Sequence, residues 1–166
     1  MKTESNIKPS ALAVEQHGDK AEVILRENIT DKTRQQDGEN IVVYVYDEYR
    51  LFVPSRGNLL ESVEAEKEKW LKTAKTTEHN TLAAAIRGKR DKLLAETDAR
   101  MCFDRMGLDM PSGSTFSAWV DFLKGIASAL SGEWAVYRQA LRDLPQQEGF
   151  PFDVEWPKKP EGGDGV

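Results

Sequence analysis

The sequence of 166 residues contains a single cysteine and only two histidines. One cysteine, Cys102, excludes an internal disulfide and any zinc site built on cysteines. The histidines, His17 and His79, are far apart in the sequence, and neither belongs to a metal-binding spacing such as HExxH. We therefore expect surface or turn histidines, a Cys102 that fills a small space in the core, and no metal site.

Long apolar runs and an excess of positive charge are also absent. No apolar run approaches the roughly 20 residues that span a bilayer, and the first residues, MKTESNIKPSALAVEQ, lack the apolar stretch of a signal peptide. The 23 Lys and Arg residues against 28 Asp and Glu residues give a net charge of −5, which argues against nucleic acid binding. These absences predict a cytoplasmic protein with no membrane and no nucleic acid partner.

Groups that would carry catalysis are missing as well. The glycine-containing stretches SRGN and PSGST lack the Walker lysine and the dinucleotide-binding spacing. Acidic residues are plentiful, but apolar neighbours single out no pair of them for acid–base chemistry. The sequence therefore predicts no catalytic residue, no cofactor and no enzymatic activity.

A β-rich region is present over residues 10–56, after a polar N-terminus over residues 1–9 that we expect to be flexible. The segments ALAVEQ, AEVILREN and NIVVYVYDEYRLFVP are rich in β-branched and aromatic residues, and HGDK and TRQQDGEN separate them. Alternation along the third segment places apolar residues on both faces, so we expect both faces to be covered for part of its length. The pattern predicts a three-stranded antiparallel meander packed on helices.

The following residues, 57–144, form a predicted helical lobe. Helices are expected over residues 59–75 and 80–107, the second with Gly107 at its C′ position. Over residues 116–144 the apolar side chains recur every three or four residues, which is typical of a helix–helix seam. The period is irregular at Ser131-Gly132, where we predict a break, and Pro145 ends the helix. The seam comprises Phe116, Trp119, Leu123, Ile126, Leu130, Trp134, Tyr137, Leu141 and Leu144.

Residues 145–160 interleave aromatic residues with prolines and predict an extended arm, followed by a flexible tail over residues 161–166. Phe150, Phe152, Val154 and Trp156 have the same parity, so an extended backbone would point these side chains to one side. The arm either packs on its own helices or docks in a groove of another protein or of a second copy. The expected fold class is α+β: a small N-terminal antiparallel β-meander, a helical lobe of three to four helices, and the extended Pro/aromatic arm.

Residues 134–160, WAVYRQALRDLPQQEGFPFDVEWPKKP, closely resemble the C-terminal signature of the bacteriophage tail assembly chaperone family. That signature reads as an aromatic residue, YRQALRD, a short turn containing Gln, GFP, and a V-x-W-P close. A shorter block, RDKLLAETD at 90–98, is similar to an upstream block of the family, although Ala99 stands where members commonly carry tryptophan. The positions that match the signature are Trp134, Tyr137, Arg138, Gln139, Ala140, Leu141, Arg142, Asp143, Gly149, Phe150, Pro151, Val154, Trp156 and Pro157.

The resemblance implies a protein without enzymatic activity that holds a phage tail or tail-fibre protein during assembly in the host cytoplasm. Our first hypothesis is such a chaperone-like binding protein, with Arg138 and Arg142 supplying polar contacts. The alternative is a structural subunit of the mature tail or baseplate, a homo-oligomer in the virion that self-associates through the helical seam. The predicted partner-binding residues are Trp134, Tyr137, Arg138, Leu141, Arg142, Phe150, Pro151, Phe152, Val154, Trp156 and Pro157.

Overall fold

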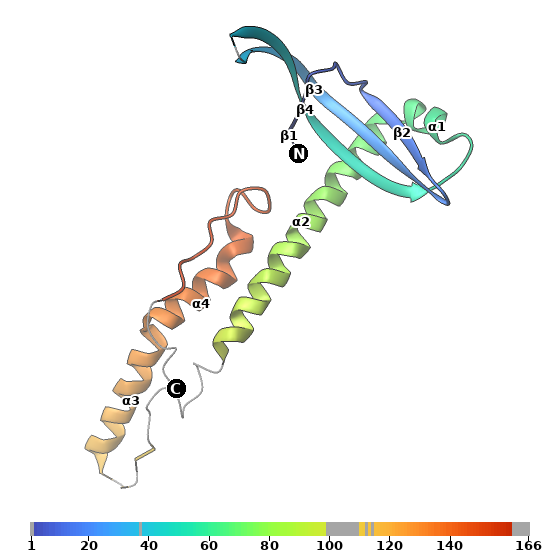
Figure 1. The fold of residues 1–166 in the computed structure, drawn as a ribbon. Coiled ribbons are helices and arrows are strands. Elements are labelled where there is room, and N and C mark those ends of the chain that lie inside the picture. Colours follow the sequence, from blue (N-terminus) through green and yellow to red (C-terminus); the bar gives the residue numbers. More distant parts are fainter. Residues whose placement is uncertain (1, 37, 99–109, 112, 114, 161–166) are drawn as a thin grey trace. The chain divides into compact units, whose positions relative to one another are not determined.

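The computed structural model describes residues 2–36, 38–98, 110–111, 113 and 115–160, and the chain forms two compact units (Figure 1). The N-terminal unit is Met1–Thr81 and the C-terminal unit is Leu82–Val166. The expected boundary near residue 56 falls before this division, because the first helical residues pack with the strands in one core.

The N-terminal unit is built on a four-stranded antiparallel sheet. Its strands are β1 (Lys2–Ser5), β2 (Leu12–His17), β3 (Lys20–Gln36) and β4 (Glu39–Pro54), in the order β1-β4-β3-β2. Gly18 and Gly38 lie in the two hairpin turns, with φ of +65° and +85° that glycine adopts without strain. This sheet and the helices after it confirm the α+β class.

Strand β1 lies where the sequence predicts a flexible N-terminus. Residues 2–5 pair with residues 44–47 of β4 and extend the expected three-stranded meander by one edge strand. Pairing of a short edge strand depends on backbone hydrogen bonds, which leave no apolar pattern in the sequence. The side-chain pattern could therefore not reveal it.

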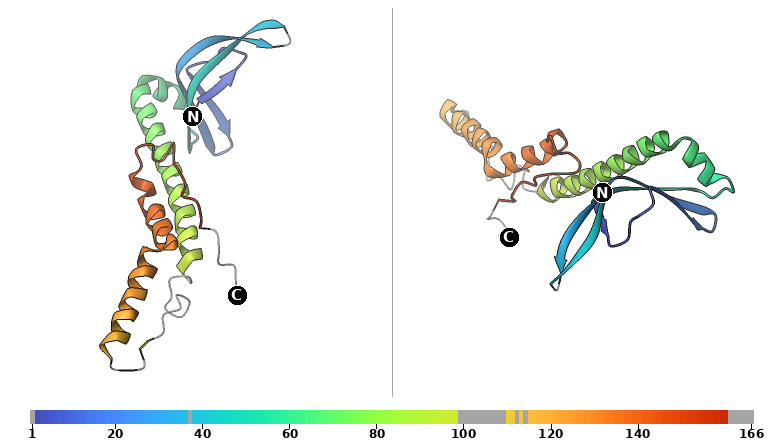
Figure 2. Two further views of the ribbon diagram at one scale, coloured as in Figure 1. Left: turned by 90° about the vertical axis from the view of Figure 1, so that its left-hand side faces the viewer. Right: turned by 90° about the horizontal axis from the view of Figure 1, so that it is seen from above.

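One face of the sheet forms the hydrophobic core of the N-terminal unit. The helix α1 (Leu59–Ala65) and the first part of α2 (Lys67–Asp98) cover this face (Figure 2). Burial of each large aliphatic side chain stabilises the fold by roughly 1.5–3 kcal/mol, so this layer holds strands and helices together. The buried members are Ala21, Val23, Leu25, Leu51, Leu59, Val63 and Ala74.

The opposite face carries a partly buried ion-pair network, in which Glu22 and Glu48 are buried and Arg50 is exposed. Arg26 Nε donates to Glu48 Oε2 at 2.7 Å, and Arg50 donates to Glu48 at 2.7 Å and to Glu22 at 3.0 Å. Tyr46 is buried with the Arg26 guanidinium over its ring, whereas Phe52 is 69% exposed. Both faces of β4 are therefore covered for part of the strand, as predicted, but charged side chains contribute to the cover on this face.

The helices differ from prediction at two points. The expected helix over residues 59–75 is divided at Glu66, where α1 ends and α2 follows. The expected break between residues 75 and 80 is wrong, because α2 is one helix over Lys67–Asp98 and contains no proline. Thr73, Thr76 and Thr77 bond their hydroxyls to carbonyls four residues earlier, as threonine can within a helix. The remainder of the expected helix, including Cys102 and Gly107, lies outside the described residues.

The predicted break at Gly132 is confirmed. Helix α3 (Phe116–Ser131) ends there and α4 (Glu133–Asp143) begins, with Gly132 in an extended conformation at φ −69° and ψ 168°. A 3₁₀ turn, η2 (Leu144–Gln146), contains Pro145 and ends the helical segment as expected.

Glu48→Gln should lower the free energy of unfolding by about 1–3 kcal/mol at neutral pH, because two arginines lose charge-assisted hydrogen bonds. Burial alone would raise the pKa of the Glu48 carboxyl, but hydrogen bonds from Arg50 and Arg26 together hold that pKa below its usual value of 4.5. The contribution is therefore present above the unfolded-state pKa and is lost as the pH falls through the folded-state pKa. Urea unfolding at neutral pH and below pH 4.5 should show the difference between wild type and variant shrinking; an unchanged difference would contradict this assignment.

Candidate partner-binding surface

A compact apolar cluster organises the C-terminal unit. Tyr137, Leu141 and Leu144 are buried on one side of α4 and η2. They pack against side chains of α2 and of the arm, which is residues 145–160; we name this group the C-terminal cluster. The packed neighbours are Leu93, Leu94, Trp134, Val154 and Trp156. The arm therefore lies on helices of its own chain, which is the first of the two alternatives for it.

Arg138 connects α4 with the last turn of α2. Its guanidinium, 11% exposed, donates to the Leu94 carbonyl oxygen at 2.8 Å and to the Thr97 hydroxyl at 2.5 Å, and forms an ion pair with Asp98 at 2.7 Å. A cation beside the last carbonyls of a helix is also favoured by the helix dipole. Arg138 therefore makes intramolecular contacts that link α4 to α2.

The first half of the arm is a series of turns, which corrects the prediction of extended backbone throughout. Residues 147–153 form hydrogen-bonded turns, with Phe150 N–H donating to the Gln147 carbonyl and Asp153 N–H donating to the Gly149 carbonyl. A side chain at Gly149 would collide with the Asp153 carbonyl oxygen. Only residues 154–160 lack helix, strand and turn, so the four side chains of equal parity do not share one direction.

Further contacts hold the arm in its conformation and place it against α2. The Gln147 side chain donates to the Glu155 carbonyl and accepts from the Glu155 N–H, both at 2.9 Å. Two cations of α2 lie over aromatic rings of the arm: the guanidinium carbon of Arg87 is 5.2 Å from the Phe150 centroid, and Lys89 Nζ is 4.2 Å from that of Trp156. Such contacts are worth about 0.5–1 kcal/mol at exposed sites.

The predicted partner-binding residues thus divide by exposure. Tyr137, Leu141 and Pro151 are buried, and Trp134, Arg138, Phe150, Val154, Trp156 and Pro157 are half-buried. Only Arg142 and Phe152 are exposed, Phe152 to 62%. Most of the predicted partner-binding residues therefore pack inside the unit, and only Arg142 and Phe152 are exposed on its surface.

An open groove of about 400 Å³ runs along α4 beside the end of the arm. Val136 and Ala140 lie four residues apart on α4 and line one side, and Val136 is 63% exposed. Sequence reasoning missed both, because the seam directed attention to the buried side of the same helix. We call this the α4–arm groove; it is lined by Glu133, Val136, Tyr137, Ala140, Pro157, Lys158, Lys159 and Pro160.

Helix α3 exposes part of the predicted seam. Phe116, Trp119 and Leu123 follow the three- and four-residue spacing and are all exposed. The charged residues of this helix, Asp121 and Lys124, form an ion pair with each other. The burial of the seam therefore changes at Gly132. Its α4 half packs in the C-terminal cluster, whereas three residues of its α3 half are exposed to solvent.

Arg138→Met should lower the free energy of unfolding by about 1–3 kcal/mol, because the Leu94 carbonyl and the Thr97 hydroxyl lose a charged donor. Arg142→Met, four residues along the same helix, is the matched control and should change stability by no more than about 0.5 kcal/mol, since Arg142 is exposed. Urea unfolding followed by far-UV circular dichroism measures both. Equal effects of the two substitutions would show that Arg138 does not stabilise the contact between α4 and α2.

The comparisons with known proteins concern this same unit. Residues 83–161 match the family model described as phage tail assembly chaperone protein. No curated protein and no solved structure matches the chain. Among the helices that the structure describes, none has the length and apolar character needed to cross a membrane. The match over residues 83–161 supports the phage tail assembly chaperone family, which is the family that the sequence resembles.

Proposed function

We propose that this chain is a non-enzymatic binding protein that holds a phage tail or tail-fibre component in the host cytoplasm while the virion is assembled. The observation that carries the proposal is the position of the α4–arm groove, because every residue that lines it falls inside the matched region 83–161. The family supports a chaperone role in tail assembly, and the groove supplies an apolar surface for such a role.

The chemistry of the groove suits an apolar segment with acidic neighbours. Val136, Ala140 and Pro157 present carbon to the ligand, and Lys158 and Lys159 bring two positive charges against the one negative charge of Glu133. Full burial of one aliphatic side chain contributes roughly 1.5–3 kcal/mol, and a small open groove accommodates only a few such side chains. Small interfaces are typical of weak and transient complexes. A chaperone that must release its client requires reversible binding of this kind.

The residues predicted from sequence take two roles in this proposal. Arg142 and Phe152 contact the partner directly, because they are exposed. The buried and half-buried members, among them Tyr137, Leu141 and Trp156, hold α4 and the arm in place and so keep the groove open. Substitution of the second group is therefore expected to affect stability and binding together, whereas Val136 offers a test of binding alone.

Val136→Glu should weaken capture of the tail component at least about tenfold, because a charge replaces an apolar contact in the groove. It should leave the unfolding free energy within about 0.5 kcal/mol of wild type, because Val136 is exposed. Ala95→Glu, an exposed α2 position outside the groove, is the matched control for added negative charge. Pull-down from cells producing the phage, with quantification of tail proteins by mass spectrometry, measures the effect.

The contact can be located independently by a photo-crosslinking amino acid at position 136, with position 95 as the control. A crosslink from position 136 to a tail or tail-fibre protein supports the proposal. Crosslinks of equal yield from both positions, or tail-protein capture that Val136→Glu does not weaken, would overturn the groove as the contact site.

The exposed side of α3 favours a second candidate, a structural subunit of the tail or baseplate that self-associates through Phe116, Trp119 and Leu123. Mass spectrometry of purified virions separates the two candidates. A chaperone should be found with tail proteins in the lysate and be missing from virions, whereas a structural subunit should be present in virions at fixed stoichiometry. Light scattering of the purified chain tests the association itself: a strict monomer would exclude the self-associating subunit.

A further inference from the structure

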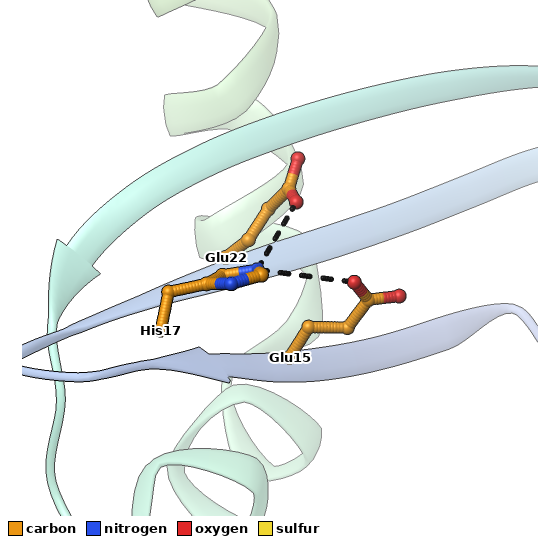
Figure 3. A group of neighbouring side chains, drawn as sticks. All are labelled: Glu15, His17 and Glu22. Atoms are coloured by element: carbon orange, nitrogen blue, oxygen red, sulfur yellow. Dashed lines mark ion pairs between the residues drawn. The ribbon is translucent and has the colours of Figure 1, made fainter.

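Three potential metal-ligand side chains meet on the sheet of the N-terminal unit, outside the matched family region. His17 Nε2 lies 3.9 Å from Glu15 Oε2 and 3.8 Å from Glu22 Oε2. One ligand atom from each residue lies within 4.8 Å of the other two. Figure 3 shows both carboxylates approaching the same imidazole nitrogen from different sides.

The β2–β3 hairpin places these residues together. Glu15 and His17 are two residues apart on β2, so their side chains point to the same face of the sheet. Glu22 on β3 is the register partner of Glu15, and partners in an antiparallel pair also share a face. The tight turn at Gly18 and Asp19 fixes this register, since His17 pairs with Lys20. The three ligands are therefore held by paired backbone.

Glu22 is the residue that indicates a ligand at this site. It is only 7% exposed, and its Oε1 accepts a hydrogen bond from Arg50 at 3.0 Å. Among the described residues no hydrogen bond reaches its Oε2, because the 3.8 Å to His17 exceeds hydrogen-bonding distance. The described residues contain no fully buried side-chain oxygen without a partner, so Oε2 keeps some contact with solvent, but a carboxylate on a residue that is 7% exposed still favours a cation beside it. Here that oxygen points toward the other two ligand atoms.

We propose that Glu15, His17 and Glu22 bind one divalent transition-metal ion of the zinc class. Zinc accepts imidazole nitrogen and carboxylate oxygen at about 2.0–2.2 Å, so neighbouring ligand atoms of a tetrahedral site lie about 3.4 Å apart. The observed separations, all within 4.8 Å, would shorten to that value when the three side chains close on an ion. Three protein ligands leave the fourth position for water. An imidazole ligand makes the site unsuited to Mg²⁺ or Ca²⁺, which prefer oxygen alone.

The charged side chains on this face sum to zero before any cation binds. Glu15 and Glu22 are acidic, while Lys20 and Arg50 share the same face of the sheet from β3 and β4. Arg50 holds one oxygen of Glu22 and leaves the other directed at the site, which is the orienting role of an outer partner in metal centres. A protonated His17 between the two carboxylates is the competing arrangement, and it needs no metal.

No sequence motif indicates this group, and the prediction of no metal site rests on ligand spacings within one segment. Here the spacing along β2 is i and i+2, and the third ligand comes from the next strand. Only strand register brings Glu22 to the other two, so no one-dimensional pattern marks the site.

The test is titration of the full chain with Zn²⁺ alone, by calorimetry, in a Cys102→Ser background that removes thiol binding. The expected result is one site per chain. His17→Ala should weaken zinc binding by at least about tenfold, since loss of even an outer partner of a metal ligand weakens binding about 10–100-fold. His79→Ala, which removes the other histidine of the chain, is the matched control and should leave zinc affinity unchanged.

Glu15→Gln provides a second variant that spares the buried Glu22, and it should also weaken zinc binding. The ¹⁵N resonances of the His17 imidazole report direct ligation and should shift on zinc addition at a pH where the ring is already neutral. An absence of zinc binding by the intact site, or equal affinity in the wild type, His17→Ala and Glu15→Gln chains, would overturn the proposal. The second arrangement, with a protonated His17 alone, would then stand.

Discussion

The C-terminal unit depends on one largely enclosed guanidinium, that of Arg138, and the apolar cluster beside it. Arg138 bonds to the end of α2 through the Leu94 carbonyl oxygen and the Thr97 hydroxyl, where the helix dipole favours a cation. Tyr137 and Leu141, its neighbours on α4, then bury their side chains against α2 and the arm. The polar contacts of Arg138 and the apolar contacts of its neighbours together hold α4 against α2. Without both, the arm would lack a surface on which to lie.

This arrangement explains how one short segment can be both structural and functional. The inward side of α4 is occupied by the C-terminal cluster, so its outward side, with Val136 and Ala140, is free to line the α4–arm groove. The arm contributes Trp156 to the inside and Pro157 to the groove, which couples the stability of the unit to the shape of its surface. The two alternatives for the arm, packing on its own helices and contact with a partner, are therefore compatible.

Much of the architecture could be predicted from the sequence, because the spacing of apolar residues and the positions of glycine and proline depend on local sequence alone. The break at Gly132, the stop at Pro145 and the strands after residue 10 follow from glycine, proline and β-branched residues. The continuous α2 could not be predicted, because the threonines, His79 and Asn80 at its middle are weak helix formers, and the packed residues that anchor the helix lie on either side of them. Only the segment that contains the candidate site was predicted, from its aromatic and arginine residues. Which of these residues face inward depends on tertiary packing. The α4–arm groove is formed by two separate segments, so the sequence pattern could not reveal it.

The central claim is that the outward side of α4 and the end of the arm receive a tail component. Methyl cross-saturation by solution NMR tests it most directly, with the chain labelled and the bound tail protein irradiated. The account predicts that Val136 and Ala140 lose the most intensity, while Val23 and Leu25 in the sheet core stay unchanged. The largest losses on α3 or on the sheet, with Val136 and Ala140 unaffected, would contradict it.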